Sequence, residues 1–136
     1  MTSNQTWSDL GIDVDICEVL IKRGITSPFP IQTLTIPDAL SGKDVCGKAK
    51  TGSGKTLAFG IPMIQNLNLD IKASTASLRV LILVPTRELA VQVSEELEPI
   101  ADVRGLKIAA IYGGANIETQ IKTIKKGLDV VAATPG

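Results

Sequence analysis

The stretch CGKAKTGSGKT, from Cys46 to Thr56, decides how the rest of this chain is interpreted. Its end fits the P-loop pattern G-x-x-x-x-G-K-[ST], in which backbone N–H groups at the start of a helix surround phosphate oxygens. The place of the first glycine holds Ala49, whose methyl group is tolerated where φ is negative. The stretch therefore predicts a phosphate-binding loop, and a glycine-rich turn with a lone lysine is the alternative interpretation.

Two kinds of residue in this loop carry the expected chemistry. Gly52 and Gly54 permit the backbone angles and the close approach that a bound phosphate requires. Lys55 can reach the β- and γ-phosphates as a point charge, and the Thr56 hydroxyl can bind Mg²⁺. We therefore expect a nucleoside triphosphate and Mg²⁺ as ligands.

The segments around the loop alternate between strand and helix patterns. Short aliphatic runs predict strands, and apolar residues at helical spacing predict helices. The expected strands cover 44–49, 78–84, 106–114 and 128–136, and the expected helices cover 14–23, 33–42, 55–66, 87–102 and 117–127. From residue 44 onward the order β-α-β-α-β-α-β predicts an α/β domain with a parallel sheet flanked by helices. Residues 1–8 are expected to be frayed and 69–77 to form a surface loop.

Glycine and proline clusters follow every expected strand. They lie at 47–54, Pro85-Thr86, Gly113-Gly114 and Thr134-Pro135-Gly136. In open parallel sheets, ligands bind outside the carboxyl ends of the strands. We therefore expect the binding residues of this chain in these clusters.

The composition argues against several other classes of protein. The chain has 136 residues, which suits one small domain, and 14 basic residues balance 14 acidic ones. With no net charge, nucleic-acid binding would have to depend on local groups. Two cysteines and no histidine argue against a zinc site and against a disulfide framework. No apolar run approaches the roughly 18 residues of a membrane span, so we expect a cytoplasmic protein with no membrane partner.

Several stretches resemble the motifs of DEAD-box RNA helicases, in the order in which that family has them. AKTGSGKT at 49–56 has the A-x-T-G-x-G-K-T form of motif I, and PTRELA at 85–90 matches motif Ia. GITSPFPIQ at 24–32 resembles the Q motif, while YGG at 112–114 and TPG at 134–136 resemble the GG element and motif Ib. The resemblance covers nearly the whole chain. It implies the N-terminal part of the first RecA-like domain of an ATP-dependent RNA helicase.

The resemblance implies an ATP site built from the Q motif and motif I. The Gln32 amide would recognise adenine by accepting from N6 and donating to N7, a pattern that GTP lacks. Trp7 stands where the family usually has an upstream Phe, and Ile25 where many members carry an aromatic that stacks on the base. The residues implied to contact nucleotide are Trp7, Ile25, Gln32, Ala49, Lys50, Thr51, Gly52, Ser53, Gly54, Lys55 and Thr56, with Lys55 and Thr56 in catalytic roles. The alternatives are that Gln32 bonds loop backbone and that Trp7 anchors the first helix in the core.

The resemblance also implies an RNA-binding surface with little sequence specificity. Its residues would be Pro85, Thr86, Arg87, Gly113, Gly114, Thr134, Pro135 and Gly136. Backbone N–H groups, hydroxyls and a guanidinium can all bind phosphates, and such contacts do not read bases. The alternatives are an ion pair between Arg87 and an acidic neighbour, and a plain turn at Gly113-Gly114.

The family also has a D-E-A-D strand, an S-A-T motif and a second RecA-like domain, and none of these is in the 136 residues. We therefore expect a C-terminally truncated domain, with 1–33 as the N-terminal segment and Q motif and 34–136 as a partial RecA-like ATP-binding domain. The implied partners are RNA, the remainder of the first domain and the second domain. Because phosphoryl transfer depends on charges that those parts position, we expect this chain alone to bind nucleotide weakly without hydrolysis. Uncovered strand edges also carry a hazard of non-native self-association.

Two other functions stay open at this stage. One is a different P-loop NTPase or kinase, which would need a pocket for an acceptor substrate and would not predict PTRELA or Gln32. The other is a non-catalytic module that binds nucleotide or RNA, in which the 136 residues are the whole working protein.

Overall fold

The computed structural model describes residues 5–67 and 78–136. Two compact units make up the chain, Met1–Leu67 and Asn68–Gly136. The expected surface loop at 69–77 and the first four of the residues expected to be frayed lie outside the described residues. Within the described ranges, no helix combines the length and the apolar character needed to cross a membrane.

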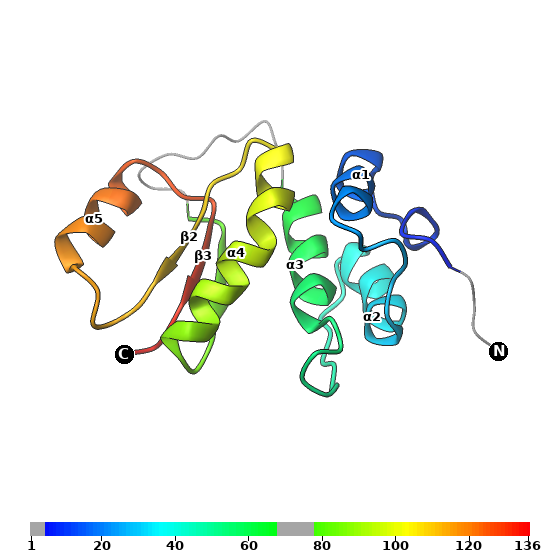
Figure 1. Cartoon of the computed structure of the whole chain (residues 1–136), viewed down its shortest axis with the longest axis horizontal. Coiled ribbons are helices and arrows are strands. Elements are labelled where there is room, and N and C mark those ends of the chain that lie inside the picture. The colour runs from blue at the N-terminus through cyan, green and yellow to red at the C-terminus, as the bar shows by residue number, and fades with distance from the viewer. Residues whose placement is uncertain (1–4, 68–77) are drawn as a thin grey trace. The chain divides into compact units, whose positions relative to one another are not determined.

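The first unit is built from helices (Figure 1). A short 3₁₀ helix, η1, spans Ser8–Leu10, and the α-helices are α1 (Val14–Lys22), α2 (Pro30–Leu40) and α3 (Lys55–Gln65). α2 packs along α3, and the buried side chains of this unit include Ile16, Leu20, Ile36, Leu57, Ile61 and Ile64. The core of this unit is therefore mainly aliphatic, with the indole of Trp7 also buried in it.

The ends of this unit are tied down by side chains that the sequence patterns did not indicate. Trp7 is 2% exposed, so the expectation of fraying is wrong for this residue. The Gln65 amide, at the end of α3, accepts a hydrogen bond from Asp13 N and donates one to Gly11 O, each at 2.9 Å. The end of α3 thus holds the turn that precedes α1.

Two expected elements of the first unit differ in the structure. α2 begins at Pro30 rather than at residue 33, because proline suits the first helical position, where its missing N–H is not needed. The strand expected at 44–49 is not formed. No described strand pairs with this segment, and a strand without a neighbour lacks the ladder of hydrogen bonds that defines it.

The second unit is a three-stranded parallel sheet with helices between its strands (Figure 1). Along the chain its elements are β1 (Val80–Leu83), α4 (Arg87–Val103), β2 (Ile108–Ile111), α5 (Ile117–Lys125) and β3 (Val130–Ala133). The strand order is β1-β3-β2, and Val80 and Ile108 both pair with Val130. The expected α/β class and parallel sheet are confirmed, with three strands in the described residues where four were expected.

One helix covers one face of this sheet. α4 packs against β2 and β3 through a buried stripe that includes Val93, Leu97 and Ile100, as its helical spacing predicted. The other face is partly open at β1, where Leu81 and Leu83 are 57% and 63% exposed while Ile82 is buried. The aliphatic run at 78–84 therefore forms a strand, but β1 is not buried on both faces.

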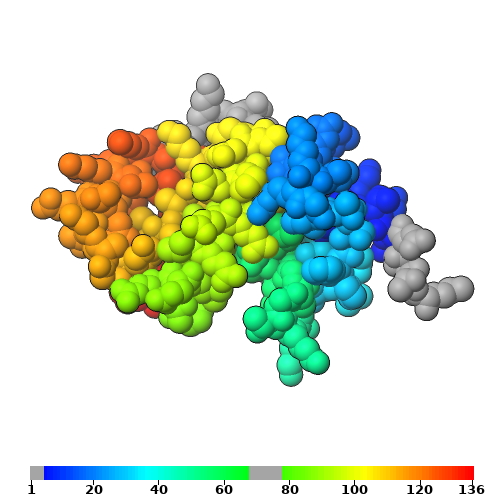
Figure 2. Space-filling view, in the orientation of Figure 1, coloured from blue at the N-terminus to red at the C-terminus, as the bar shows by residue number. Residues whose placement is uncertain are grey.

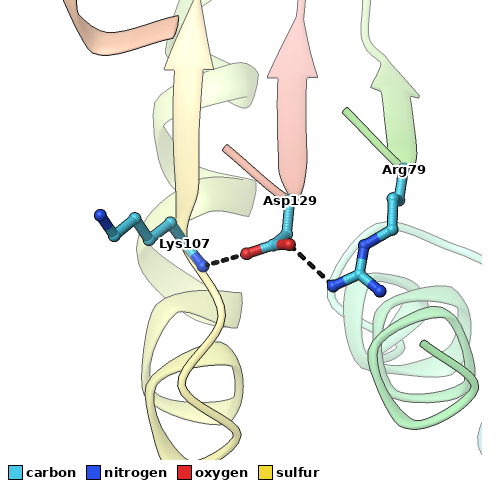
Figure 3. A network of polar contacts seen from close by, with 3 residues as sticks. All are labelled: Arg79, Lys107 and Asp129. Atoms are coloured by element: carbon cyan, nitrogen blue, oxygen red, sulfur yellow. Dashed lines mark hydrogen bonds and ion pairs between the residues drawn. The ribbon is translucent and has the colours of Figure 1, made fainter. Parts of the chain in front are cut away.

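A buried carboxylate joins the starts of the three strands. Asp129 lies just before β3, and its carboxylate accepts from Arg79 Nη2 at 2.7 Å and from Lys107 N at 2.9 Å (Figure 3). Arg79 and Lys107 immediately precede β1 and β2, so these contacts align the amino ends of all three strands. The carboxyl ends, and the loops that follow them, lie at the opposite edge.

Candidate nucleotide site and nucleic-acid interface

The phosphate loop leads directly into α3. Gly52 and Gly54 have φ values of +81° and +86°, a region that glycine adopts without strain. Ser53 N donates to Lys50 O at 3.2 Å, and the Ser53 hydroxyl donates to the same oxygen, so this turn is closed by its own bonds. The turquoise and green surface in Figure 2 shows the loop projecting into solvent.

The start of α3 presents the groups that an anion needs. Gly54 is its N-cap, and Lys55, its first residue, is exposed, while Thr56 is half-buried. The first N–H groups of a helix have no partner inside the helix, and they carry the positive end of its dipole. A triphosphate could therefore meet these N–H groups, the Lys55 ammonium and the Thr56 hydroxyl together.

Gln32 connects the Q-motif segment to this loop. Its amide Nε2 donates to Gly54 O at 3.0 Å, and its Oε1 accepts from Phe29 N at 2.6 Å. The contact is so close that a Cβ at Gly54 would lie 2.3 Å from Gln32 Nε2. Only glycine fits this position, for reasons of space as well as of backbone angle. The alternative interpretation, in which Gln32 bonds loop backbone, thus describes a contact that the structure contains.

That contact leaves part of the Gln32 amide unused. An amide oxygen has two lone pairs and an amide nitrogen has two hydrogens, so each atom can make one more hydrogen bond. The remaining lone pair and N–H are those that adenine N6 and N7 would need. Holding the loop and recognising adenine are therefore compatible, although Gln32 is 1% exposed.

Trp7 and Ile25, the other residues expected near the base, are joined to each other. The Trp7 indole N–H donates to Ile25 O at 2.9 Å, and the indole itself faces the core. This arrangement agrees with the alternative in which Trp7 is a core anchor. Direct contact of Trp7 with a nucleotide stays a prediction.

The residues of the loop fit a nucleotide bound with Mg²⁺. The glycine N–H groups and the exposed Lys55 ammonium suit the oxygens of a triphosphate. The Thr56 hydroxyl supplies an oxygen ligand of the kind that Mg²⁺ prefers. Within residues 5–67 and 78–136, no three His, Cys, Asp or Glu side chains gather into a metal site. Thr56 is therefore the protein group that we would assign to the ion.

The second unit brings three of the predicted RNA-binding clusters to one edge of the sheet. The parallel strands β1, β2 and β3 end next to Pro85, Tyr112 and Thr134. A Cβ at Gly114 would lie 3.0 Å from Arg87 Nη1, and one at Gly113 would lie 3.8 Å from the Gly136 carbonyl carbon. The clusters that the sequence separates by tens of residues are thus neighbours in space.

Helix starts supply further anion-binding groups at this edge. The Thr86 hydroxyl accepts from Leu89 N at 3.2 Å and caps α4, and the Asn116 side chain caps α5 by accepting from Glu118 N at 2.9 Å. Both residues are exposed. Helix N-termini favour phosphates because their N–H groups and dipoles point outward.

Arg87 also has an acidic neighbour, as the alternative interpretation for this residue required. Its Nε lies 3.2 Å from Glu88 Oε1, and both side chains are mostly exposed. The pKa of Glu88 is lowered, first by a hydrogen bond from its own backbone N–H and then by Arg87. An exposed pair of this kind is weak, so a phosphate could displace Glu88 from the guanidinium.

Two polar residues of these sites were missed by the sequence patterns. Gln120 Oε1 accepts from Tyr112 N at 2.8 Å and so fixes the segment that leads to Gly113-Gly114. Asn116 as a helix cap could have been found from its position before the apolar Ile117, since Asn is a preferred cap residue. Gln120 gave no such signal, because its partner is a backbone group of another element.

One unit has a P-loop at a helix start, and the other has a parallel sheet with glycine and proline loops at its carboxyl edge; together these features define a P-loop nucleotide-binding protein of the α/β class. Comparison with known proteins gives the family. The family model described as "DEAD/DEAH box helicase" matches residues 29–136, and the chain belongs to this family.

Curated relatives agree over almost the whole chain. The ATP-dependent RNA helicase DeaD of Escherichia coli strain K12 is 44% identical over 132 residues, which are 96% of this chain and 20% of that protein. The DEAD-box ATP-dependent RNA helicase CshA of Geobacillus kaustophilus is 44% identical over 131 residues, or 27% of its length. The chain thus spans about a fifth to a quarter of the curated relatives that it matches.

Solved structures give the same fold. A DEAD box protein from the hyperthermophile Methanococcus jannaschii matches with a TM-score of 0.86 and 38% identity, over 96% of this chain and 35% of that chain. The RNA helicase Prp28 from Chaetomium thermophilum, solved bound to ADP, matches with a TM-score of 0.87 and 33% identity, over 97% of this chain and 32% of that chain. The resemblance to the DEAD-box family and the RecA-like fold are confirmed.

Proposed function

We propose that this chain is the ATP-binding portion of an ATP-dependent RNA helicase, which couples ATP hydrolysis to local RNA unwinding or to remodelling of RNA–protein complexes. The observation that carries this proposal is the bond from Gln32 to Gly54, which links a predicted adenine-reading amide to a phosphate loop. The membership of the DEAD/DEAH box family supports it.

The nucleotide would be bound by the residues of the first unit. Gly52, Gly54 and the first N–H groups of α3 would hold the phosphates, with Lys55 as the cation. Thr56 would bind Mg²⁺, which neutralises phosphate charge in reactions of this class. Gln32 would select adenine. The flanking loop residues Ala49, Lys50, Thr51 and Ser53 would shape the same site.

RNA would be bound by the carboxyl edge of the sheet in the second unit. Arg87 would contact a phosphate, and the exposed backbone of Gly113, Gly114 and Gly136 would allow the strand to approach closely. Pro85, Thr86, Thr134 and Pro135 would complete this surface. Because these groups contact phosphates and not bases, binding would have little sequence specificity.

The 136 residues alone would bind nucleotide weakly and would not hydrolyse it. They contain no D-E-A-D or S-A-T motif and no second RecA-like domain, and catalysis in this class depends on charges placed from several sides of the γ-phosphate. The partners in the full-length protein would be the rest of the first domain and the second domain. We place the full-length protein in the cytoplasm.

Substitution of Lys55 by Ala tests this function in the full-length protein. RNA-stimulated ATP hydrolysis should fall by about 10²–10³-fold, because removing one preorganised charge from a transferring group has effects of that size. RNA binding measured without nucleotide should stay unchanged. Lys22→Ala, at the exposed end of α1, is the matched control and should keep full activity. Full ATPase activity in Lys55→Ala would contradict the assignment of this loop as the phosphate-binding site.

A further inference from the structure

Phe29 occupies a helix N-cap, a position where an aromatic side chain makes no capping hydrogen bond. It is the N-cap of α2, a place where Ser, Thr, Asp or Asn usually accepts a hydrogen bond from the helix start. Phe has no acceptor in its side chain. The helix start is satisfied otherwise, because Pro30 has no N–H, while Gln32 N donates to Phe29 O at 2.9 Å. The ring therefore needs a different explanation from capping.

The Phe29 ring lies against the phosphate loop and is open to solvent. The side chain is 53% exposed, although a buried position is usual for so large an apolar group. It lines a cavity of about 420 Å³ between the start of α2 and the loop, together with Leu34, Ala49, Gly52 and Ser53. That volume is in the range of about 300–1,000 Å³ that small-molecule sites have.

The same ring lies beside the Gln32 amide. A Cβ at Gly54 would be 3.0 Å from Phe29 Cδ2 and 2.3 Å from Gln32 Nε2, so the ring edge and the amide meet at one glycine. Flat apolar surface and a hydrogen-bonding amide are thus adjacent. A purine offers the matching pair of features, an aromatic face and a polar edge.

The other aromatic side chains of this unit do not combine these properties. Trp7 is buried and bonded to Ile25 O, and Ile25 itself is aliphatic. Phe59 is partly exposed on α3, but it lines a different cavity of about 450 Å³ with Pro62 and Met63. Among residues 5–67, Phe29 is the aromatic residue that is both exposed and in contact range of Gly54.

We propose that Phe29 supplies the aromatic surface on which the purine of a bound nucleotide stacks, with the free N–H and lone pair of Gln32 at the edge of that purine. The inference rests on the proposed nucleotide site and assigns to Phe29 the stacking that Ile25 cannot provide. Loss of stacking of a base on an aromatic side chain weakens binding by about 1–3 kcal/mol, which is about fivefold to 150-fold.

The test measures binding of ADP and of inorganic tripolyphosphate by calorimetry in the full-length protein with Mg²⁺. Phe29→Leu keeps apolar bulk but removes the ring, and Phe29→Tyr keeps the ring. We expect Phe29→Leu to lower the affinity for ADP at least about fivefold and to leave the affinity for tripolyphosphate unchanged, because only ADP carries a base. Phe29→Tyr should bind ADP within about twofold of the parent. Ile21→Ala, which truncates an exposed apolar side chain on α1, is the control and should change neither affinity.

Each other outcome overturns the proposal. Unchanged ADP affinity in Phe29→Leu would remove Phe29 from the base site. Equal weakening of ADP and tripolyphosphate would mean that the ring only supports the loop. A gain in ADP affinity would mean that the ring obstructs the site. Lys55→Ala, measured in the same experiment, distinguishes failure of the Phe29 proposal from failure of the proposed function. If Lys55→Ala retains full affinity for both ADP and tripolyphosphate, the proposed function fails, whatever the result for Phe29.

Discussion

Gln32 carries two functions in one small side chain. Its amide fixes the carbonyl of Gly54, the residue that starts the phosphate-binding helix, and it retains one donor and one acceptor. A base that used these two groups would be hydrogen-bonded, through a single side chain, to the backbone of the phosphate loop. Recognition of the base and geometry of the loop are therefore connected by one residue.

Gln32→Ala should reduce the preference of the full-length protein for ATP over GTP. A bidentate amide contact contributes about 1–3 kcal/mol of discrimination between bases, so the ratio of the two dissociation constants should fall about fivefold to 150-fold. Competition binding with both nucleotides gives this ratio. Affinity for both should also fall, because the bond to Gly54 O is lost.

Thr33→Ala is the control for that measurement. Thr33 follows Gln32 on α2, and its hydroxyl donates only to Pro30 O at 2.9 Å. The ATP-to-GTP ratio of this variant should equal that of the parent. A Gln32→Ala protein with an unchanged ratio would take Gln32 out of the adenine site.

At the scale of elements, Asp129 sets how three short strands start. Each strand has four residues, so few ladder hydrogen bonds define its register. The Asp129 carboxylate accepts a hydrogen bond from the Arg79 guanidinium before β1 and one from the backbone N–H of Lys107 before β2. Arg79 is mostly buried beside it. An error of register at this end would displace the RNA-facing loops at the other end.

Asp129→Asn should destabilise the sheet by about 3–5 kcal/mol, because it removes the negative charge of a buried ion pair whose other member, Arg79, is mostly buried. Hydrogen exchange of β1 and β3 amides in the full-length protein should therefore become about a hundredfold to several thousandfold faster. Asp38→Asn is a control of the same chemistry, since the Lys43–Asp38 pair is largely exposed. That change should have an effect below about 1 kcal/mol. Equal protection in Asp129→Asn and the parent would mean that the network does not hold the strands.

Elements that depend on local interactions were predicted well, and those that depend on distant parts of the chain were not. The helices from 87 and from 55 were predicted within one or two residues, because an apolar stripe is a local property of the sequence. The strand at 44–49 was not formed, since a strand requires a partner that its own sequence does not specify. For the same reason the pairing of Gln120 with Tyr112 N could not be predicted, whereas the phosphate loop could, and a bond from Gln32 to loop backbone was one of two interpretations that the sequence left open.

At the scale of the whole molecule, two of the exposed apolar side chains, Leu81 and Leu83, lie on the sheet of the second unit. Leu81 and Leu83 alternate with the buried Ile82 along β1 and are exposed, and among the described residues β1 pairs with β3 alone and is an edge strand. Such an edge is a template for pairing with another chain.

The 136-residue chain on its own should therefore self-associate through β1. The double substitution Leu81→Glu and Leu83→Glu should weaken association by at least about tenfold, because burial of one leucine contributes about 1.5–3 kcal/mol. Light scattering across a concentration series measures this effect. Gln92→Glu, on the exposed side of α4, adds one negative charge elsewhere and should leave association unchanged. Equal association of the double variant and the parent would place the contact on another surface.

The two positive-φ glycines of the phosphate loop differ in how much sequence variation they allow. At Gly52 a side chain would meet nothing within 4 Å, so Asn or Asp could occupy that backbone conformation at a modest energetic cost. At Gly54 the backbone angle and the Gln32 amide each exclude a Cβ independently, so no compensating change at a single site restores another residue. A smaller residue at position 32 would remove the contact with the amide but not the strain of the backbone angle, so we expect Gly54 to tolerate substitution less than Gly52.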